Sequence, residues 1–390
     1  MKHVVPYSGT HKERSQAAHV DQAALPEGSV RCSDGSTERK RMKRLASRSF
    51  PLSCRAAVLT LSVLCAAHTA HAADLTVTAF GGTWEKAYRK CFVEPFEKQT
   101  GKSVDVTLGN PLQWVNQVAA NPARPPIDVM VSTPEATHIA IERKLLDPVT
   151  VKEVPNLAQL DPRLVAYGHG YGFPITYGDF GLMYSTKRVK TPPKSWKEFV
   201  DGVVAGKYQA GLPDINYVAT PAGLITLFNQ LYGGSPTNIQ PALDQVKRMR
   251  DSKNVTFFSD PNAPLNAMRN GDIDIAMYYD GRAWAEHDTT NPDIAWINPS
   301  PGSVAFPNMA VKVKNGSPLG TQFLNTLASS EGQTCFANAM QYTASNTKVA
   351  YNAKVKPRIA TVDGSIWVNF DDIGRYVPQW IEAWNKQIGR

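Results

Sequence analysis

The fold is best predicted from one stretch, Tyr167-Gly-His-Gly-Tyr-Gly-Phe-Pro-Ile-Thr-Tyr-Gly-Asp-Phe-Gly-Leu-Met-Tyr184. Glycine and aromatic residues dominate before Pro174, and apolar residues then take nearly every second position, which predicts extended chain. Glycine beside aromatic residues lets the backbone bend and lets a ligand approach it closely. We therefore interpret the stretch as a strand that leaves one α/β lobe and enters a second, acting as a hinge and as part of a binding wall. Taken alone, the stretch is equally compatible with an ordinary buried strand.

The start of the chain is typical of an export signal. Residues 1–41 show no apolar periodicity, and we interpret Met42 as the true start of translation. Basic residues between 43 and 55 precede the apolar run Ala56 to Ala67, and Ala70-His71-Ala72 is a small-x-small cleavage site. This order predicts a secretory signal peptide that is too short to span a membrane. We expect residues 1–72 to be removed and the product to be exported to the periplasm.

The charge of the chain lies mainly in this leader. Residues 1–72 hold 11 of the 42 Lys and Arg and 5 of the 34 Asp and Glu, so the remaining 318 residues carry a net charge of +2. The high overall charge is therefore no argument for nucleic-acid or membrane binding, and no basic stripe interleaved with aromatics is present. A length of 318 residues exceeds what one hydrophobic core usually serves, which favours two lobes.

Two cysteines remain after residue 72, Cys91 and Cys335. An even pair in an oxidising compartment favours a disulfide. Both also lie on apolar stripes, so two buried free thiols are the alternative.

The first part of the exported chain repeats a strand-loop-helix pattern. Strands are predicted at 75–80, 104–108 and 127–131, and a helix follows each of them. Thr83 is expected to cap the first helix, and Ser132-Thr133-Pro134 to open the third. This order predicts a largely parallel sheet with helices on both faces. The loops Gly81 to Trp84, Gly109-Asn110 and Ser132-Thr133 should then share the rim where such sheets bind ligands.

The later part is richer in helices. Ser195 and Glu198 have the spacing of a capping box. Further helices are predicted at 220–231, 241–250, 263–270 and 376–388, with strands at 272–279 and 294–297 and an extended return to the first lobe at 303–313.

Motifs for catalysis are absent. The exported chain has three histidines, at 138, 169 and 287, with no zinc-ligand spacing among them, and it has no phosphate-binding loop. An enzyme is therefore disfavoured, and neither a cofactor nor a metal is expected.

Aromatic and polar residues at the ends of strands suit a small amine or zwitterion, through cation–π contacts and charge-assisted hydrogen bonds. Each of them could equally be a core or surface residue. The candidate ligand-binding residues are Gly82, Thr83, Trp84, Ser132, Thr133, Tyr177, Asp179, Asp214, Tyr279, Asp280, Arg282 and Asn308.

Several segments in order resemble the periplasmic solute-binding proteins of ABC importers, in the spermidine/putrescine-type cluster. They are the signal peptide, the Gly-Gly-Thr-Trp loop, Phe96-Glu-Lys-Gln-Thr-Gly101, Ile127-Asp-Val-Met-Val131, Pro193-Lys-Ser-Trp-Lys-Glu-Phe199 and Asn270-Gly-Asp-Ile-Asp-Ile-Ala276. The resemblance covers essentially all of 73–390.

The resemblance implies a two-lobed α/β fold of the type II periplasmic-binding class, each lobe a mostly parallel sheet flanked by helices. Lobe 1 is expected at 73–181 plus 307–345 and lobe 2 at 182–306 plus 346–390. Ligand binding in the cleft between them would stabilise a closed state that engages permease subunits of the transporter. It also implies a monomer, with Thr83 and Trp84 in first-lobe contacts and Tyr279 stacking on the ligand.

Departures from the polyamine binders affect the expected ligand. Those proteins place carboxylates early in the second lobe and on the returning hinge, where this chain has Val218-Ala-Thr-Pro-Ala222 and Ala305-Phe-Pro-Asn308. Arg282 would repel a polyamine and grip a carboxylate. We therefore expect a small amine or an amino-acid-like zwitterion, with a polyamine binder proper as the first alternative.

Two other classes stay open. Adjacent Tyr278 and Tyr279 are similar to the paired phenolates of ferric-ion-binding relatives, although neighbours on a strand point to opposite faces. The other class is an exported enzyme with a small substrate.

Overall fold

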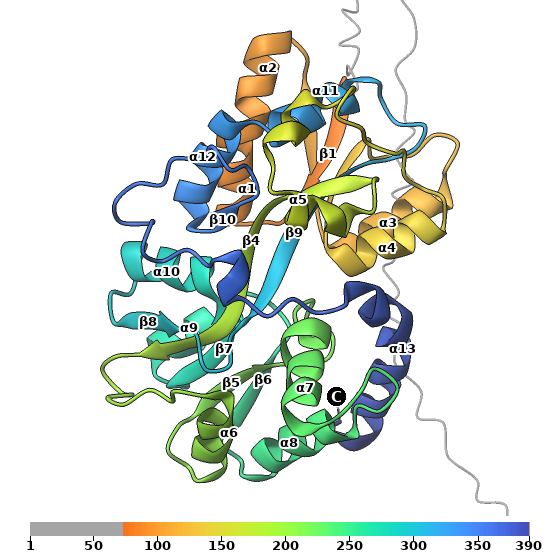
Figure 1. Cartoon of the computed structure of the whole chain (residues 1–390). Helices are drawn as coiled ribbons and strands as arrows, with labels where there is room; N and C mark the ends of the chain where they lie inside the picture. Colours follow the sequence, from red (N-terminus) through yellow and green to blue (C-terminus); the bar gives the residue numbers. More distant parts are fainter. Residues whose placement is uncertain (1–72, 390) are drawn as a thin grey trace, which may run out of the picture. The chain divides into compact units, whose positions relative to one another are not determined.

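The strand predicted from 167–184 is present in the computed structural model, which describes residues 73–389 (Figure 1). It is β4 (Gly172–Ser185), a 14-residue strand whose residues are nearly all buried. The part before Gly172 is not extended, because residues 162–168 form short helical turns and His169 has a positive φ of 48°. The predicted signal peptide and its cleavage site lie outside the described residues.

The described strands form one ten-stranded sheet with the order β2-β1-β3-β9-β4-β7-β5-β6, and β8 and β10 also pair with β4. Their bounds are β1 (Leu75–Ala79), β2 (Val104–Leu108), β3 (Val129–Ser132), β5 (Ala210–Pro213), β6 (Val255–Phe258), β7 (Ile275–Tyr279), β8 (Ile294–Ile297), β9 (Val304–Lys312) and β10 (Thr343–Ala344). Most of these strands lie within a few residues of their predicted positions.

Parallel and antiparallel pairing divide this sheet. β1 pairs in parallel with β2 and β3, and β5 pairs in parallel with β6 and β7. All pairings of β4 are antiparallel, and β9 runs antiparallel to both β3 and β4. The long strands β4 and β9 therefore join two parallel sets, as expected for an α/β chain that passes from one lobe to another and returns (Figure 1).

Helices separate the strands in the described chain (Figure 1). The α-helices are α1 (Thr83–Tyr88), α2 (Glu94–Thr100), α3 (Pro111–Ala120), α4 (Pro134–Glu142), α5 (Pro162–Val165), α6 (Trp196–Val204), α7 (Leu227–Tyr232), α8 (Gln240–Asp251), α9 (Ala263–Asn270), α10 (Asp280–Thr289), α11 (Leu319–Leu327), α12 (Ser330–Met340) and α13 (Phe370–Gln387). The π-turns η1 (Arg89–Val93) and η4 (Pro221–Thr226) extend α1 and α7, and the 3₁₀ turns are η2 (Pro155–Gln159), η3 (Ala166–Gly168) and η5 (Val362–Gly364). None of the helices in this part is long and apolar enough to cross a membrane.

Side-chain caps explain some of the helix starts. The Ser195 hydroxyl accepts a hydrogen bond from the Glu198 amide at 3.1 Å, so the predicted cap of α6 is confirmed. The prediction for Thr83 is wrong, because α1 begins at Thr83 itself and Gly82 precedes it with a φ of 77°. Thr133 does occupy the position before α4, but its hydroxyl makes no capping bond.

Apolar side chains gather in separate clusters on the two sides of the sheet's long strands. One cluster joins β1 to β3 with α1, α2, α11 and α12, and it includes Trp84 and Phe336. A second joins the β5 side of the sheet with α6, α7, α8 and α13, and it includes Trp196 and Trp384.

A disulfide connects distant parts of the first of these clusters. The Sγ atoms of Cys91 in η1 and Cys335 in α12 are bonded, across a sequence separation of 244 residues. The predicted pair of cysteines thus lies together beside Phe92, which packs on Phe336 with ring centroids 5.4 Å apart.

The C-terminal helix α13 packs against α4 as well as against α8 and η4. Asp371 in its first turn lies 3.1 Å from His138 of α4 and 3.3 Å from His169. A Cβ at Gly374 of α13 would lie 3.4 Å from the Glu135 carbonyl oxygen, an ordinary contact distance, so the two helices are close here. The N-terminal turns of α4 and α13 therefore lie directly against each other.

Candidate functional site

Tyr279 ends β7 and lies within an aromatic group that comes from several segments. Its ring centroid is 4.9 Å from Phe180 on β4, 5.5 Å from Phe306 on β9 and 6.5 Å from Tyr217 in the loop after β5. Tyr279 is partly exposed, whereas Tyr217 is buried. The sheet thus presents one accessible aromatic face at the point where β4, β7 and β9 run side by side.

Arg282 follows three residues later, in the first turn of α10, and is also partly exposed. Among residues 73–389, no carboxylate oxygen lies within 4.0 Å of its guanidinium nitrogens, although other arginines of this region, such as Arg269 and Arg358, do have acidic partners. Burial opposes the charge of Arg282, but the nearby tyrosines, which ionise at lower pH than Arg282 does, raise its pKa above the ordinary value. A permanent cation therefore lies here without a protein anion in contact.

Four tyrosines lie near enough to affect the pKa of this guanidinium: Tyr217, Tyr278, Tyr279 and Tyr342. Burial raises the pKa of each of them above the usual tyrosine value, to about 12 for Tyr342. All four are accordingly neutral at physiological pH, so none of them offsets the charge of Arg282.

Asp179 and Asp280 form a buried carboxyl pair beside the same group. Asp179 on β4 is 2% exposed and Asp280 at the start of α10 is 1% exposed. The Ser365 hydroxyl donates to Asp179 at 3.0 Å, and the Gly281 amide donates to Asp280 at 2.6 Å, but each carboxyl keeps one oxygen without a partner. Burial raises the pKa of Asp179 to about 7, and burial together with Asp179 raises the pKa of Asp280 well above its usual value. The pair therefore retains at least one proton near neutral pH.

Glu135 is the one acid of α4's first turn, and it affects the site electrostatically. Burial is the main cause that raises the pKa of Tyr279, and Glu135 makes one of the smaller contributions. Burial raises the pKa of Glu135 itself, with a smaller opposing effect from the Thr133 side chain and the Glu135 amide. The Thr133 hydroxyl is close enough to affect Glu135 but makes no properly aligned hydrogen bond. The Thr133 hydroxyl is thus buried and unsatisfied, whereas the Glu135 side chain is partly exposed.

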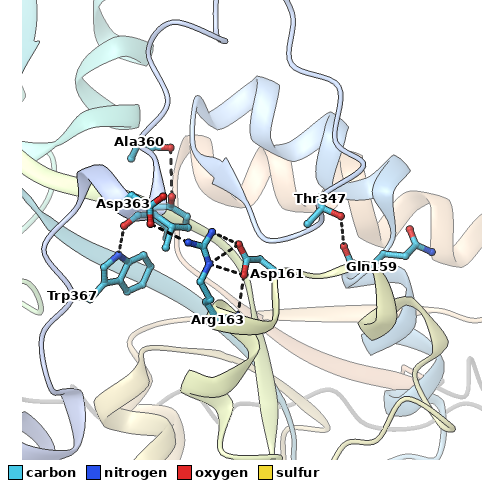
Figure 2. A network of polar contacts seen from close by, with 9 residues as sticks. Gln159, Asp161, Arg163, Thr347, Ala360, Asp363 and Trp367 are labelled. Carbon is cyan, nitrogen blue, oxygen red and sulfur yellow. Dashed lines mark hydrogen bonds and ion pairs between the residues drawn. The ribbon is translucent and has the colours of Figure 1, made fainter.

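A cavity of about 460 Å³ lies at the start of α13. Its walls include Pro134 of α4 and Phe370 of α13, and the Phe370 ring lies 6.4 Å from Phe306. Arg163 also lines it, but Figure 2 shows that this guanidinium is held by Asp161 at 2.7 Å and Asp363 at 3.0 Å. Arg163 is thus already neutralised, in contrast to Arg282.

The predicted residues of the first loop lie at the start of α1, and Trp84 belongs to a different apolar cluster from Tyr279. Gly82 and Thr83 are exposed at the start of α1. Trp84 is only 1% exposed and packs on Tyr88 and Phe336, with centroid distances of 5.0 Å to both. The side chain of Trp84 is therefore enclosed by the core, contrary to the expectation of an open ligand contact.

Most of the other predicted residues are buried or make hydrogen bonds within the protein. Ser132 is buried and donates to the Thr133 carbonyl at 3.2 Å. Tyr177 is buried in β4, Asp214 accepts from the Asn216 amide at 2.6 Å, and Asn308 donates to a threonine hydroxyl on β4 at 3.3 Å. Of the twelve predicted residues, Tyr279, Asp280, Arg282 and Asp179 are brought together most clearly.

The geometry opposes a ferric site at Tyr278 and Tyr279. Tyr278 is fully buried, packs in a different apolar cluster from Tyr279 and donates its hydroxyl to the Pro261 carbonyl. Within residues 73–389, no three His, Cys, Asp or Glu side chains cluster as metal ligands would. The two phenols accordingly do not converge.

Sequence reasoning missed three residues of this site: Glu135, Tyr217 and Tyr342. Glu135 follows the predicted Ser-Thr-Pro helix start, so its place on the rim could have been inferred. Tyr342 follows α12, and nothing in its local sequence links it to α10. The ring nevertheless lies against α10, since a Cβ at Gly281 would be 2.4 Å from it.

Comparisons with known proteins agree with this architecture. Residues 92–361 match the sequence profile of the family described as bacterial extracellular solute-binding protein. The norspermidine sensor of Vibrio cholerae is 23% identical over 53% of this chain and 52% of its own length. A Salmonella typhimurium periplasmic protein assigned to 2-aminoethylphosphonate binding is 26% identical over 41% of this chain and 45% of its own. The chain thus spans about half the length of these curated relatives.

A solved structure extends the match to more of the chain. The crystal structure of a protein from Bordetella parapertussis, assigned as an extracellular solute-binding protein, has a TM-score of 0.69 and 28% identity, over 80% of this chain and 98% of that one. The family profile alone covers well over half of the 390 residues. The chain belongs to the bacterial extracellular solute-binding protein family.

Proposed function

We propose that the protein is the substrate-binding component of an ABC importer. It captures a small cationic or zwitterionic solute in the periplasm and delivers it to membrane permease subunits, without catalysing a reaction. Family membership, the two parallel strand sets and the joining strands β4 and β9 support this function. The names of the curated relatives, a norspermidine sensor and a 2-aminoethylphosphonate-binding protein, support an amine-containing solute.

The lobes of this binding protein are 73–181 plus 307–345 and 182–306 plus 346–390, with the ligand held where they meet. The disposition of the apolar clusters supports these bounds, because Trp84 and Trp384 belong to different clusters. Closure of the lobes around the solute would create the surface that the permease recognises. The protein would act as a monomer after removal of residues 1–72.

One observation supports the proposed chemical class of the solute. Arg282 is a partly exposed cation that has no carboxylate partner within 4.0 Å in residues 73–389, and neutral tyrosines lie near enough to affect its pKa. A guanidinium in this setting is suited to an anionic group of a ligand, because charge-assisted hydrogen bonds are stronger away from water. A polyamine without an acidic group would instead be repelled.

A thermal-shift screen of the purified full chain tests the function. Polyamines, short amino acids, aminoalkylphosphonates, quaternary amines and Fe(III) would be added separately. A ligand at a hundred times its dissociation constant adds about 2.7 kcal/mol to stability, which raises the melting temperature measurably. Stabilisation by an amine-containing acid supports the proposal, whereas an absence of stabilisation by every small solute contradicts it. Turnover of a bound solute would identify an enzyme instead.

A further inference from the structure

One carboxylate joins helix α13 to α4 and to the segment before β4. Oδ1 of Asp371, in the first turn of α13, lies 3.1 Å from Nδ1 of His138 on α4 and 3.3 Å from Nε2 of His169. The α13 backbone is close to the same ring, since a Cβ at Gly374 would lie 3.5 Å from Cδ2 of His138. Two histidines from separate elements therefore converge on a single oxygen atom, and we call these three residues the Asp371 cluster.

His138 has a carboxylate at both of its ring nitrogens. Its Nε2 lies 3.2 Å from Oε1 of Glu142, one turn further along α4, and its Nδ1 faces Asp371. A neutral imidazole carries one N–H, so one of its two nitrogens would present a lone pair to a carboxylate oxygen. The imidazolium form donates to both oxygens, and such charge-assisted hydrogen bonds are the stronger kind. Both contacts are thus favourable only when His138 is protonated.

The side chains of the Asp371 cluster are accessible enough to exchange protons with water. That of His138 is 19% exposed, that of Asp371 36% and that of His169 47%. His169 can donate to Asp371 through Nε2 even in its neutral form. The contact between α4 and α13 therefore persists at alkaline pH, but it loses the charge-assisted bond from His138.

Other titratable groups lie on the elements packed around this cluster. Helix α3, which also packs on α4, carries none. The others are Glu135 and Glu142 on α4, Asp372 and Arg375 on α13, Arg163 and Tyr167 beside the cavity that His169 and Asp371 also line, and Lys312 on β9. Carboxylates, guanidinium and ammonium groups ordinarily keep their charge between about pH 5 and about pH 8, and phenols stay neutral. Burial raises the pKa of Glu135, so its titration has to be common to all the proteins that are compared.

The Asp371 cluster spans the proposed boundary between the lobes, because α4 and His169 belong to lobe 1 and α13 belongs to lobe 2. Its strength therefore affects the balance between open and closed arrangements. A second polar contact spans the same boundary at α10, where the Gln341 amide donates to Oδ2 of Asp288 at 2.7 Å. The donor of this second contact is an amide, which does not titrate, so it is a counterpart without a histidine.

We infer that His138, His169 and Asp371 form a proton-dependent contact between the lobes, which strengthens as the pH falls from about 8 to about 5.5. Protonation of His138 favours the arrangement in which α13 lies on α4, and deprotonation lets the lobes separate more readily. The inference rests on the proposed function, because it assigns the two helices to lobes that close over a solute. A solute that binds the closed arrangement is then held more tightly in a mildly acidic medium.

A double-mutant cycle measures this contact without any solute. The wild type, His138→Gln, Asp371→Asn and the double variant, all as full chains, would be unfolded in urea, which is uncharged, at about pH 5.5 and about pH 8. The coupling between the two positions should be about fivefold in the unfolding equilibrium constant at the lower pH and less than about twofold at the higher. Asp179 and Glu135 titrate in all four proteins, so their effects largely cancel in the cycle.

His287→Gln is the matched control for the histidine substitution. Nδ1 of His287 contacts the carbonyl oxygen of Ile294 at 2.7 Å instead of a carboxylate, and both residues lie in lobe 2. A cycle of His287→Gln with Asp371→Asn should show no coupling at either pH. Circular dichroism of each variant establishes that it is folded.

Small-angle X-ray scattering of the unliganded full chain measures closure itself. The wild type should have a smaller radius of gyration at the lower pH than at the higher, and Asp371→Asn should show a smaller change. Gln341→Asn tests the counterpart, because Asn tolerates the positive φ of 55° there but is too short to reach Asp288 in the same way. This variant should keep the pH dependence of the wild type.

The outcomes distinguish this inference from the proposed function. A coupling that is equal at the two pH values, or that grows toward the higher pH, overturns the inference. A pH-dependent coupling with an unchanged radius of gyration also overturns it, since the contact would then join helices that do not move apart. The thermal-shift screen decides the proposed function separately, because a solute that stabilises the chain leaves a binding protein whether or not the Asp371 cluster responds to pH.

Discussion

Neutralising Asp179 should stabilise the protein at alkaline pH and remove part of its pH dependence. The carboxyl is 2% exposed and burial raises its pKa to about 7, whereas a carboxyl in an unfolded chain has a pKa near the ordinary value of 3.8. Between these two values the folded chain binds a proton that the unfolded chain does not. The free energy of unfolding therefore falls as the pH rises through this window.

The size of the effect follows from the difference of about 3 pKa units between 3.8 and about 7. Each unit corresponds to about 1.4 kcal/mol, so the wild type should lose about 4 kcal/mol in all, of which about 2–3 kcal/mol falls between about pH 5 and about pH 8. Asn in place of Asp179 cannot ionise and keeps an oxygen for the Ser365 hydroxyl. Its amide can also donate to Asp280, whose Oδ2 has no partner.

Guanidinium denaturation at the two pH values measures the effect through the midpoint and slope of unfolding. The free energy of unfolding of Asp179→Asn should equal or moderately exceed that of the wild type near pH 5. Near pH 8 it should be clearly higher than that of the wild type. Asp105→Asn, at an exposed position of β2, is the matched control and should leave the pH dependence unchanged. A variant that is less stable than wild type near pH 8, or that keeps the full pH dependence, would refute a shared proton in the Asp179 and Asp280 pair.

Three further perturbations follow from the packing. Reduction of the Cys91–Cys335 disulfide, which closes a 244-residue separation, should lower stability by about 4–5 kcal/mol, and an unchanged melting temperature with reductant would contradict this. Trp384→Ala should cost about 3–5 kcal/mol in denaturation experiments because the side chain is 1% exposed, unless the C-terminal helix is dispensable for folding. Gly178→Ala would place a Cβ 2.6 Å from the Tyr342 ring, so we expect a destabilisation of about 1–3 kcal/mol, and a neutral effect would show that the ring moves freely.

The sequence predicted those elements whose stability depends on local pattern. Alternating apolar residues located β4, and the Ser195 to Glu198 spacing located the start of α6, because strand burial and helix capping both act over a few residues. The strand predicted at 272–279 begins only at Ile275. The Asp274 backbone still bonds to Gln209 and Ser185, and its carboxylate accepts hydrogen bonds from Arg188 at 2.8 Å and from the Gln209 amide at 2.9 Å.

The site was predictable only where its residues follow a strand end directly. Tyr279, Asp280 and Arg282 do so, and the structure gathers them. The place of Glu135 after the predicted helix start could have been inferred, whereas the packing of α13, which begins at Phe370, on that turn could not. Long-range packing of this kind leaves no trace in the local sequence.

The glycines of β4 show how a correct physical cue led to an incomplete interpretation. Their lack of a Cβ predicts a close approach to the backbone, and we expected a ligand to make it. In the structure the approaching groups belong to the protein: a Cβ at Gly178 would lie 2.6 Å from an Asp280 oxygen, and one at Gly181 would lie 2.5 Å from the Ser303 hydroxyl. The small residues of β4 thus allow α10 and β9 to close over the strand, which buries Asp280 and fixes the helix that carries Arg282. Glycine in the joining strand serves the solute indirectly, by positioning the cation that we propose to bind it.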